Sequence, residues 1–332
     1  MGEANRDHQQ EDWLQGIWAA VPTPFLADQT LDLDGIAGNV TRFRALGLAG
    51  LFCNGLMGEG WSLSTAERCQ ILEAMVAAAH GSLRIGVVTT HGSIVETLEL
   101  SRHAAASGAD HIVLMRPAGL FSGDELADLV RMVCDAVACP VVLFDSEAQS
   151  GGYPSAVIRE LAKEGRIHAV KCTRNGDAIA ALRAECSEDI LICDPYESHA
   201  LANLLRFGQH TLYADPEPYL YQLPEMRPIH DYFEEHRRAN FVAMLDQRAR
   251  LEPFRRVYEF WIQTPLMRGQ PINAALKHWC RRMGLAAGPV RRPLRELTAI
   301  QAAALDADLD TAFQSALGAQ PEALARGAPA SR

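Results

Sequence analysis

Residues 85–116 read IGVVTTHGSIVETLELSRHAAASGADHIVLMR and contain one complete repeat of two kinds of secondary structure. The apolar runs at 85–90 and 111–116 are rich in β-branched residues, and each predicts a buried strand. Between them, residues 93–106 have the amphipathic spacing of a helix, and Gly108 stands where that helix would end. A strand, a helix and a further strand in this order are the repeating unit of parallel α/β folds.

The same alternation extends in both directions up to residue 215. Eight strand signals, most of them followed by a helical one, predict a (β/α)8 TIM barrel, an α/β fold. A doubly wound sheet is the alternative, but the G-x-G-x-x-G fingerprint is missing after the first strand. The predicted strands are 17–22, 50–54, 85–90, 111–116, 141–145, 169–172, 190–193 and 211–214, and the predicted helices include 64–79, 93–106, 123–137, 155–164, 177–185 and 198–207.

After residue 215 the pattern becomes purely helical, with segments at 229–250, 253–264, 271–283 and 294–317. We therefore expect one barrel with an extension, although 332 residues would also suffice for two domains. The expected organisation is a flexible N-terminal segment at 1–14, the barrel at 15–225, a C-terminal helical extension packed on the barrel at 226–318, and a loose tail at 319–332.

Composition excludes several classes of partner. The chain has 31 basic and 41 acidic residues, a net charge of −10, which disfavours nucleic acid. No apolar stretch approaches the length of a membrane-spanning helix, so no membrane partner is expected. The eight cysteines form no C-x-x-C pair, which predicts neither a metal site nor disulfides and favours the cytoplasm.

Only three of the 31 basic residues are lysines. Lys171 lies in the strand signal HAVKCT, at the end of a strand where the reacting groups of a barrel gather. If its side chain faces the interior, burial favours the neutral amine, which is a nucleophile toward carbonyl carbon. The alternative is a lysine paired with a carboxylate at the strand end. Lys163 is expected at a solvated helix end. Lys277 is expected on a helix surface, or with its aliphatic stem buried and its ammonium group reaching solvent.

Several segments, in order and correctly spaced, resemble the dihydrodipicolinate synthase / N-acetylneuraminate lyase family. The resemblance implies a TIM barrel, commonly a homotetramer, that works without a metal or other cofactor as an aldolase or lyase on 2-oxo acids. It also places the Schiff-base lysine of the family on Lys171. The matching segments are AVPTPF at 20–25, GLMGEGWSLSTAER at 55–68, VVLFDSEAQSGG at 141–152, HAVKCTRNGD at 168–177 and INAALKHWCRRMGLAAGPVRRPLREL at 272–297.

The chain also departs from the pattern of this family. The glycine-flanked loop carries Leu56 and Met57 where the family has hydroxylated residues, so backbone amides are left to hold a substrate carboxylate. Phe144 replaces the tyrosine that serves as general acid/base, and a phenyl ring cannot transfer a proton. The arginine that synthases place after strand 5 is Gln149 here.

Other residues at strand ends are candidates to replace these groups. His91 has the best side-chain type for general acid/base catalysis, and Asp145 lies next to Phe144. Arg116 is a candidate carboxylate clamp, and Ala214 is expected to line the substrate site. Each has a structural alternative: a backbone bond for His91, a turn cap for Asp145 and an acidic partner for Arg116.

We therefore predict a class I carbon–carbon lyase or aldolase that forms a Schiff base between Lys171 and a pyruvate-type 2-oxo acid. The apolar residues Leu56, Met57 and Phe144 favour an aryl or alkyl substrate. A hydro-lyase acting through the same imine and a non-catalytic metabolite-binding barrel are the two alternatives. The expected partners are a small-molecule substrate and further copies of the chain, as a dimer or tetramer.

Overall fold

The computed structural model describes residues 12–317. The predicted tail at 319–332 lies outside this range, and so does most of the predicted segment at 1–14. The described chain begins with the short 3₁₀ helix Asp12–Leu14.

Eight parallel strands form one sheet in the order β7-β6-β5-β4-β3-β2-β1-β8. The outermost strands β7 and β8 contact each other, so the sheet is a nearly closed barrel. The predicted (β/α)8 TIM barrel is confirmed, and all eight strands lie within two residues of their predicted limits. The strands are β1 (Gly16–Ala20), β2 (Gly50–Cys53), β3 (Arg84–Val88), β4 (His111–Met115), β5 (Val141–Asp145), β6 (Ala169–Cys172), β7 (Leu191–Cys193) and β8 (Thr211–Ala214).

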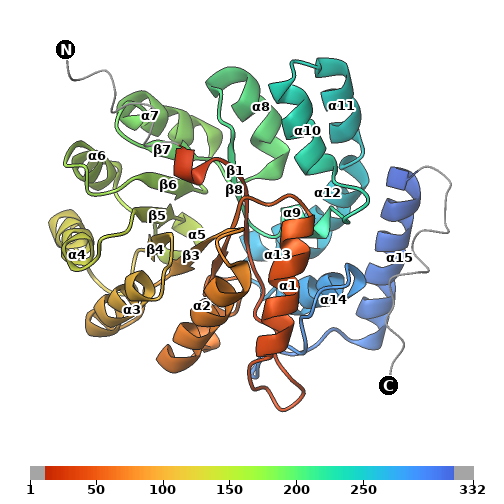
Figure 1. Ribbon diagram of the computed structural model, residues 1–332, viewed down its shortest axis with the longest axis horizontal. Coiled ribbons are helices and arrows are strands. Elements are labelled where there is room, and N and C mark those ends of the chain that lie inside the picture. Colours follow the sequence, from red (N-terminus) through yellow and green to blue (C-terminus); the bar gives the residue numbers. More distant parts are fainter. Residues whose placement is uncertain (1–11, 318–332) are drawn as a thin grey trace. The chain divides into compact units, whose positions relative to one another are not determined.

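Helices follow most of these strands and surround them in Figure 1. Two begin with a capping box, in which a serine side chain and a glutamate three residues later bond each other's backbone N–H groups: Ser64 with Glu67, and Ser122 with Glu125. These caps fix where each helix starts and agree with the predicted limits. The helices are α2 (Thr65–Ala79), α3 (Ile94–Ala106), α4 (Gly123–Ala136), α5 (Glu147–Ser150), α6 (Ser155–Lys163), α7 (Gly176–Cys186) and α8 (Glu197–Phe207).

The chain divides into two compact units. The first holds all eight strands and consists of the described residues up to Val21 together with Ala49–Asp215. The second combines Pro22–Leu48 with the chain from Pro216 onward. Its helices are α1 (Leu33–Ala45), α9 (Glu217–Leu220), α10 (Pro228–Arg237), α11 (Phe241–Ala249), α12 (Glu252–Tyr258), α13 (Thr264–Met267), α14 (Asn273–Arg282) and α15 (Ala299–Leu317), with a π-helical turn at Glu259–Gln263.

A reciprocal pair of hydrogen bonds joins the two segments of the second unit. The Asn39 side chain on α1 donates to Ala286 O at 2.7 Å, and the Ala286 N–H donates to Asn39 Oδ1 at 2.8 Å. Asn39 is 5% exposed, so its amide group is satisfied away from solvent. Helix α1, which was not among the predicted segments, is thus tied to residues near the end of the chain.

Two predictions for the second unit are wrong. The expected helix at 229–250 is interrupted, because Ala239 has a left-handed backbone with φ of 55° and Asn240 caps α11. Lys277 is completely buried instead of lying on a helix surface. Its Nζ donates to Pro289 O at 2.8 Å and lies 4.1 Å from the centre of the Phe25 ring.

Aromatic side chains fill the interior of the barrel. Trp18 and Tyr213 have no exposed surface, and the ring of Phe52 stacks on Tyr213 with 4.6 Å between centroids. The Tyr213 hydroxyl is hydrogen-bonded to His111 Nε2 at 2.6 Å. Complete burial lowers the pKa of His111 to about 3, so this imidazole is neutral at physiological pH. The interior is therefore a packed core with one neutral polar pair.

Candidate active site

Lys171 lies near the carboxyl end of β6, and its side chain faces the barrel interior. It pairs in register with Phe144 on β5 and Cys193 on β7, and residues in register on parallel strands point to the same face. The side chain has no exposed surface. Its Nζ lies 4.3 Å from the centre of the Phe144 ring and 4.9 Å from that of Phe52. The interior position on which a reactive role of this lysine depends is thus observed.

Asp215 stands at a strand end where reacting groups are expected, but sequence reasoning did not select it as a site residue. It follows β8 directly, and its Oδ1 accepts a hydrogen bond from Lys171 Nζ in a buried ion pair. Because side chains alternate along a strand, Asp215 shares the inward face of Tyr213, whereas Ala214 points to the opposite face. Ala214 is fully buried there and does not line the interior as predicted. The alternation around Tyr213 was the signal that could have identified Asp215.

Asp145 lies one residue beyond Phe144 and faces away from Lys171. Its Oδ2 binds Arg174 Nε at 2.5 Å, and its Oδ1 accepts the backbone N–H of Tyr153 at 2.7 Å. The carboxylate has no exposed surface. Arg174 also donates to Ser155 Oγ at 2.8 Å and to Tyr153 O. Asp145 therefore holds together the segments that follow β5 and β6, and it is not brought to the lysine.

His91 and Arg116 follow β3 and β4, and neither has a recorded contact with Lys171. His91 Nδ1 accepts the backbone N–H of Ser93 at 3.1 Å, which is the structural alternative for a loop histidine. Arg116 donates only weakly, to Gly151 O at 3.3 Å and Gly152 O at 3.4 Å. Its Nε is buried without a partner among the described residues. That unused donor makes Arg116 the better of the two candidates for contact with a ligand.

The loop after β2 is held in a strained conformation. Asn54 and Glu59 both have positive φ angles, 62° and 53°, which non-glycine residues rarely adopt. Gly60 is required because a Cβ there would stand 2.0 Å from Asn54 O. Met57 is buried and Leu56 is partly exposed within this loop. Strained backbone of this kind clusters at functional sites in proteins, and the role of the Leu56–Met57 backbone stays a prediction.

The chain matches the family model of the dihydrodipicolinate synthetase family over residues 13–312. This match covers nearly all of the described chain. The chain belongs to the dihydrodipicolinate synthetase family.

Two relatives of this family member illustrate the range of activities in the family. The chain is 27% identical over 298 residues to an N-acetylneuraminate lyase of Rhizobium meliloti, covering 88% of this chain and 93% of the lyase. It is 26% identical over 291 residues to a 4-hydroxy-tetrahydrodipicolinate synthase of Methanospirillum hungatei, covering 85% of this chain and 94% of the synthase. These two similarities are nearly equal, so identity alone does not select either activity.

Solved structures of the dihydrodipicolinate synthetase family share the fold. YagE, an Escherichia coli K12 prophage protein of the dihydrodipicolinic acid synthase family solved in complex with pyruvate, superposes with a TM-score of 0.78 at 22% identity. The match covers 90% of this chain and 98% of YagE. Among residues 12–317 of this family member, no helix has the length and apolarity needed to cross a membrane.

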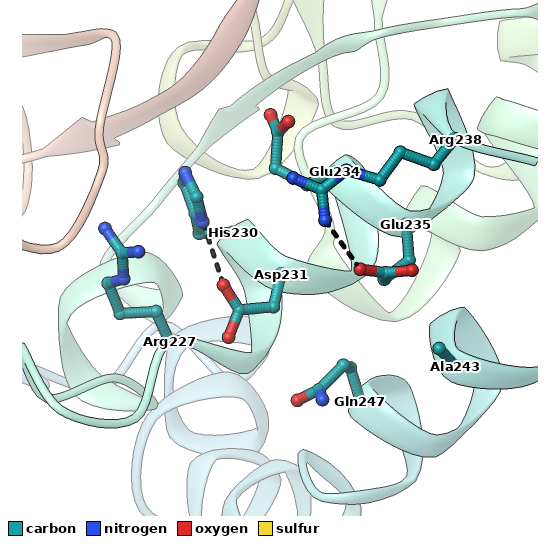
Figure 2. A pocket seen from close by; sticks show the side chains of 8 residues that line it. All are labelled: Arg227, His230, Asp231, Glu234, Glu235, Arg238, Ala243 and Gln247. Carbon is teal, nitrogen blue, oxygen red and sulfur yellow. Dashed lines mark hydrogen bonds and ion pairs between the residues drawn. The ribbon is translucent and has the colours of Figure 1, made fainter. Parts of the chain in front are cut away.

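A second candidate site in this family member is a cavity of about 260 Å³ beside α10 and α11 (Figure 2). Most of its charged side chains have partners. His230 Nδ1 is 3.0 Å from Asp231 Oδ1, and Arg238 donates to Glu235 at 2.9 Å. None of its side chains is a nucleophile toward carbonyl carbon, whereas the Lys171 amine is one. The lining residues are Arg227, His230, Asp231, Glu234, Glu235, Arg238, Ala243 and Gln247.

In the part of the chain that the structure describes, no three His, Cys, Asp or Glu side chains are grouped so that they could hold a metal ion.

Proposed function

We propose that this protein is a class I aldolase or lyase that forms a Schiff base between Lys171 and a pyruvate-type 2-oxo acid. The observation that carries the proposal is a fully buried lysine at the carboxyl end of β6, in a chain that belongs to the dihydrodipicolinate synthetase family. In this mechanism the neutral amine attacks the C2 carbonyl, water leaves, and the iminium accepts electrons from a bond to C3.

The surroundings of Lys171 suit this chemistry. Phe144 and Phe52 enclose the amino group, and their rings exclude water that would compete for it. The face of an aromatic ring attracts a cation, so both rings also stabilise the iminium once it has formed. A site with these properties favours a positively charged nitrogen that is shielded from solvent.

Two features are proposed to hold the anionic part of the substrate. Backbone N–H groups at Leu56 and Met57, in the strained loop after β2, would bind the 2-oxo acid carboxylate. Arg116 supplies a positive charge at the end of β4, next to Tyr153. The Tyr153 hydroxyl is buried without a partner in the described chain, and burial raises its pKa, so it remains a hydrogen-bond donor.

Three positions at which the chain departs from the family pattern also indicate the substrate class. Positions 56, 57 and 144 are Leu, Met and Phe, and they offer no hydroxyl group to a sugar-like or amino-acid acceptor. We propose that the second substrate is an aldehyde with an aryl or alkyl group, because an apolar lining gains free energy by burying apolar surface. Rates of cleavage of a panel of 4-hydroxy-2-oxo acids, with aryl, alkyl or hydroxylated substituents at C4, test this choice.

Borohydride trapping tests the Schiff base directly. The protein is incubated with pyruvate and sodium borohydride, and the intact mass is measured. The proposal expects a reduced adduct that maps to Lys171 and is absent from Lys171→Met, with Lys163→Met as the matched control that still forms it. A panel of 2-oxo acids that gives no adduct would exclude the mechanism and favour a non-catalytic barrel. Product analysis then separates aldol cleavage from loss of water.

A further inference from the structure

A Schiff-base reaction needs several proton transfers, and this barrel lacks the group that the family pattern supplies for that purpose. Phe144 occupies the position beside Lys171, and its ring has no exchangeable hydrogen. A replacement must reach the lysine nitrogen and must be able to accept a proton and return it. Only groups that face the same part of the interior can meet these requirements.

Most titratable groups in this region do not qualify. The Cys193 thiol shares the register of Lys171, but burial raises its pKa to about 12. Tyr213 is hydrogen-bonded to His111, and burial raises its pKa well above the ordinary value. Asp145 is bound by Arg174 on the opposite face of the strand. His91 is bonded to the backbone of its own loop.

We propose that Asp215 carries the protons of the reaction at Lys171, an inference that rests on the proposed Schiff-base function. Its Oδ1 already accepts a hydrogen bond from Nζ, and within residues 12–317 no other polar partner of Nζ is recorded. Asp215 is 7% exposed, so its proton exchange is directed to the lysine and its adducts rather than to bulk water.

Stability alone does not account for this pair. Burying two charges is costly, and replacing a buried ion pair by apolar residues is often neutral or stabilising. The neighbouring interior is aromatic, so an apolar pair would fit its surroundings. A buried lysine and carboxylate joined at the carboxyl end of a barrel are the arrangement expected of reacting groups.

The proposed steps balance in atoms and charge. The Lys171 ammonium gives a proton to the Asp215 carboxylate, and the free amine adds to C2 to form a carbinolamine after a proton moves from nitrogen to oxygen. The Asp215 carboxylic acid then protonates the C2 hydroxyl, water leaves, and an iminium remains beside the carboxylate. In cleavage, the carboxylate accepts the C4 hydroxyl proton as the C3–C4 bond breaks, and it returns that proton to C3 of the enamine.

The test compares trapping with proton transfer in the full-length protein. Wild type, Asp215→Asn and Asp215→Glu are incubated with pyruvate. One arm measures the borohydride adduct, and the other measures deuterium incorporation at C3 of pyruvate in D₂O by NMR. We expect Asp215→Asn to lose C3 exchange by at least about 100-fold and to form adduct slowly, and Asp215→Glu to recover part of the exchange. Asp194→Asn, which alters a carboxylate at the end of β7, should exchange like wild type.

The outcomes are distinguishable. No adduct and no exchange with the wild-type protein would overturn the proposed function itself. Adduct and exchange with wild type, together with an unchanged exchange rate in Asp215→Asn, would overturn the role of Asp215 alone. If circular dichroism shows that the Asn variant is unfolded, Asp215→Gly is titrated with formate, with sodium chloride as control. Recovery of exchange that follows formate concentration supports the proton role, and no recovery in the folded variant rejects it.

Discussion

Phe144 and Lys171 lie side by side on β5 and β6, with Nζ 4.3 Å from the centre of the phenyl ring. The residue that removes the family hydroxyl from this position therefore provides an aromatic face for the lysine cation. Such contacts stabilise by about 0.5–2 kcal/mol, depending on how fully the cation is desolvated. The substitution thus exchanges a proton-transfer group for a group that stabilises positive charge.

A double-mutant cycle measures this contact. We expect Phe144→Leu and Lys171→Met to show a coupling energy of about 0.5–2 kcal/mol in the free energy of unfolding, because only the wild-type pair combines ring and cation. Urea denaturation of wild type, both single variants and the double variant supplies the four values. A coupling below about 0.3 kcal/mol would show that ring and cation do not interact.

The Lys171–Asp215 ion pair predicts that removing one partner lowers the free energy of unfolding more than removing both. Asp215→Leu leaves the Lys171 ammonium buried without its carboxylate and should cost about 3–5 kcal/mol. Adding Lys171→Met removes the unpaired charge, so the double variant should regain most of that loss. Equilibrium unfolding in urea measures both. A double variant less stable than Asp215→Leu would contradict the view that this buried ion pair does not stabilise the fold.

The fold could be predicted because its signals are local. Apolar runs such as 141–145 and capping residues such as Ser64 and Ser122 fix the strands and helices within a few positions. The nucleophile could be found for a similar reason, since Lys171 is one of three lysines and lies in a strand signal.

The partner of the nucleophile could not be found in this way. Asp215 is 44 residues from Lys171 in the sequence, and the pair forms only when β8 presents that residue to the interior. Because side chains alternate along a strand, an error of one position exchanges Asp215 for Ala214 as the residue that faces the interior, and Ala214 is the residue that the sequence predicts there. The prediction that Asp145 acts beside Lys171 depended on the same alternation, and position 145 faces away from position 171. Lys277 was misplaced because helical periodicity does not show which neighbours cover a side chain.

His111 predicts a loss of stability in acid. Its pKa is about 3 in the folded protein against an ordinary 6.5, so below pH 6.5 the unfolded chain binds a proton that the folded chain does not. The free energy of unfolding should therefore fall by up to about 1.4 kcal/mol per pH unit between about pH 6.5 and pH 3 from this residue. His111→Gln should flatten that slope, and His80→Gln, at an exposed histidine, should not. Equal slopes in all three proteins would refute the prediction.

The Asp145–Arg174 pair should be structural. Arg174→Ala leaves a fully buried carboxylate without its partner and is expected to cost about 3–5 kcal/mol of stability. Arg131→Ala is the matched control, because Arg131 pairs with Asp128, Glu160 and Glu164 near the surface and should cost about 0–1 kcal/mol. Thermal unfolding compares the two. Similar losses would mean that burial does not distinguish these pairs.

Gly60 should be irreplaceable in the loop after β2. In Gly60→Ala the new Cβ meets Asn54 O at 2.0 Å, so the loop must shift, at a cost of about 1–3 kcal/mol. The proposed carboxylate-binding amides at Leu56 and Met57 move with it, and half-maximal borohydride trapping should require more pyruvate. Gly92→Ala has no atom within 4 Å of the new Cβ and should leave both measurements unchanged. A Gly60→Ala protein with wild-type trapping would separate this loop from substrate binding.

The hydrogen bonds between Asn39 and Ala286 span 247 residues of sequence. At a synthesis rate of about 5–20 residues per second, Asn39 is made about 12–50 s before its partner. Helix α1 therefore completes these contacts only after all eight strands have been translated. A nascent chain stalled near residue 215 would already contain Lys171 and Asp215, yet it would lack the partner of α1.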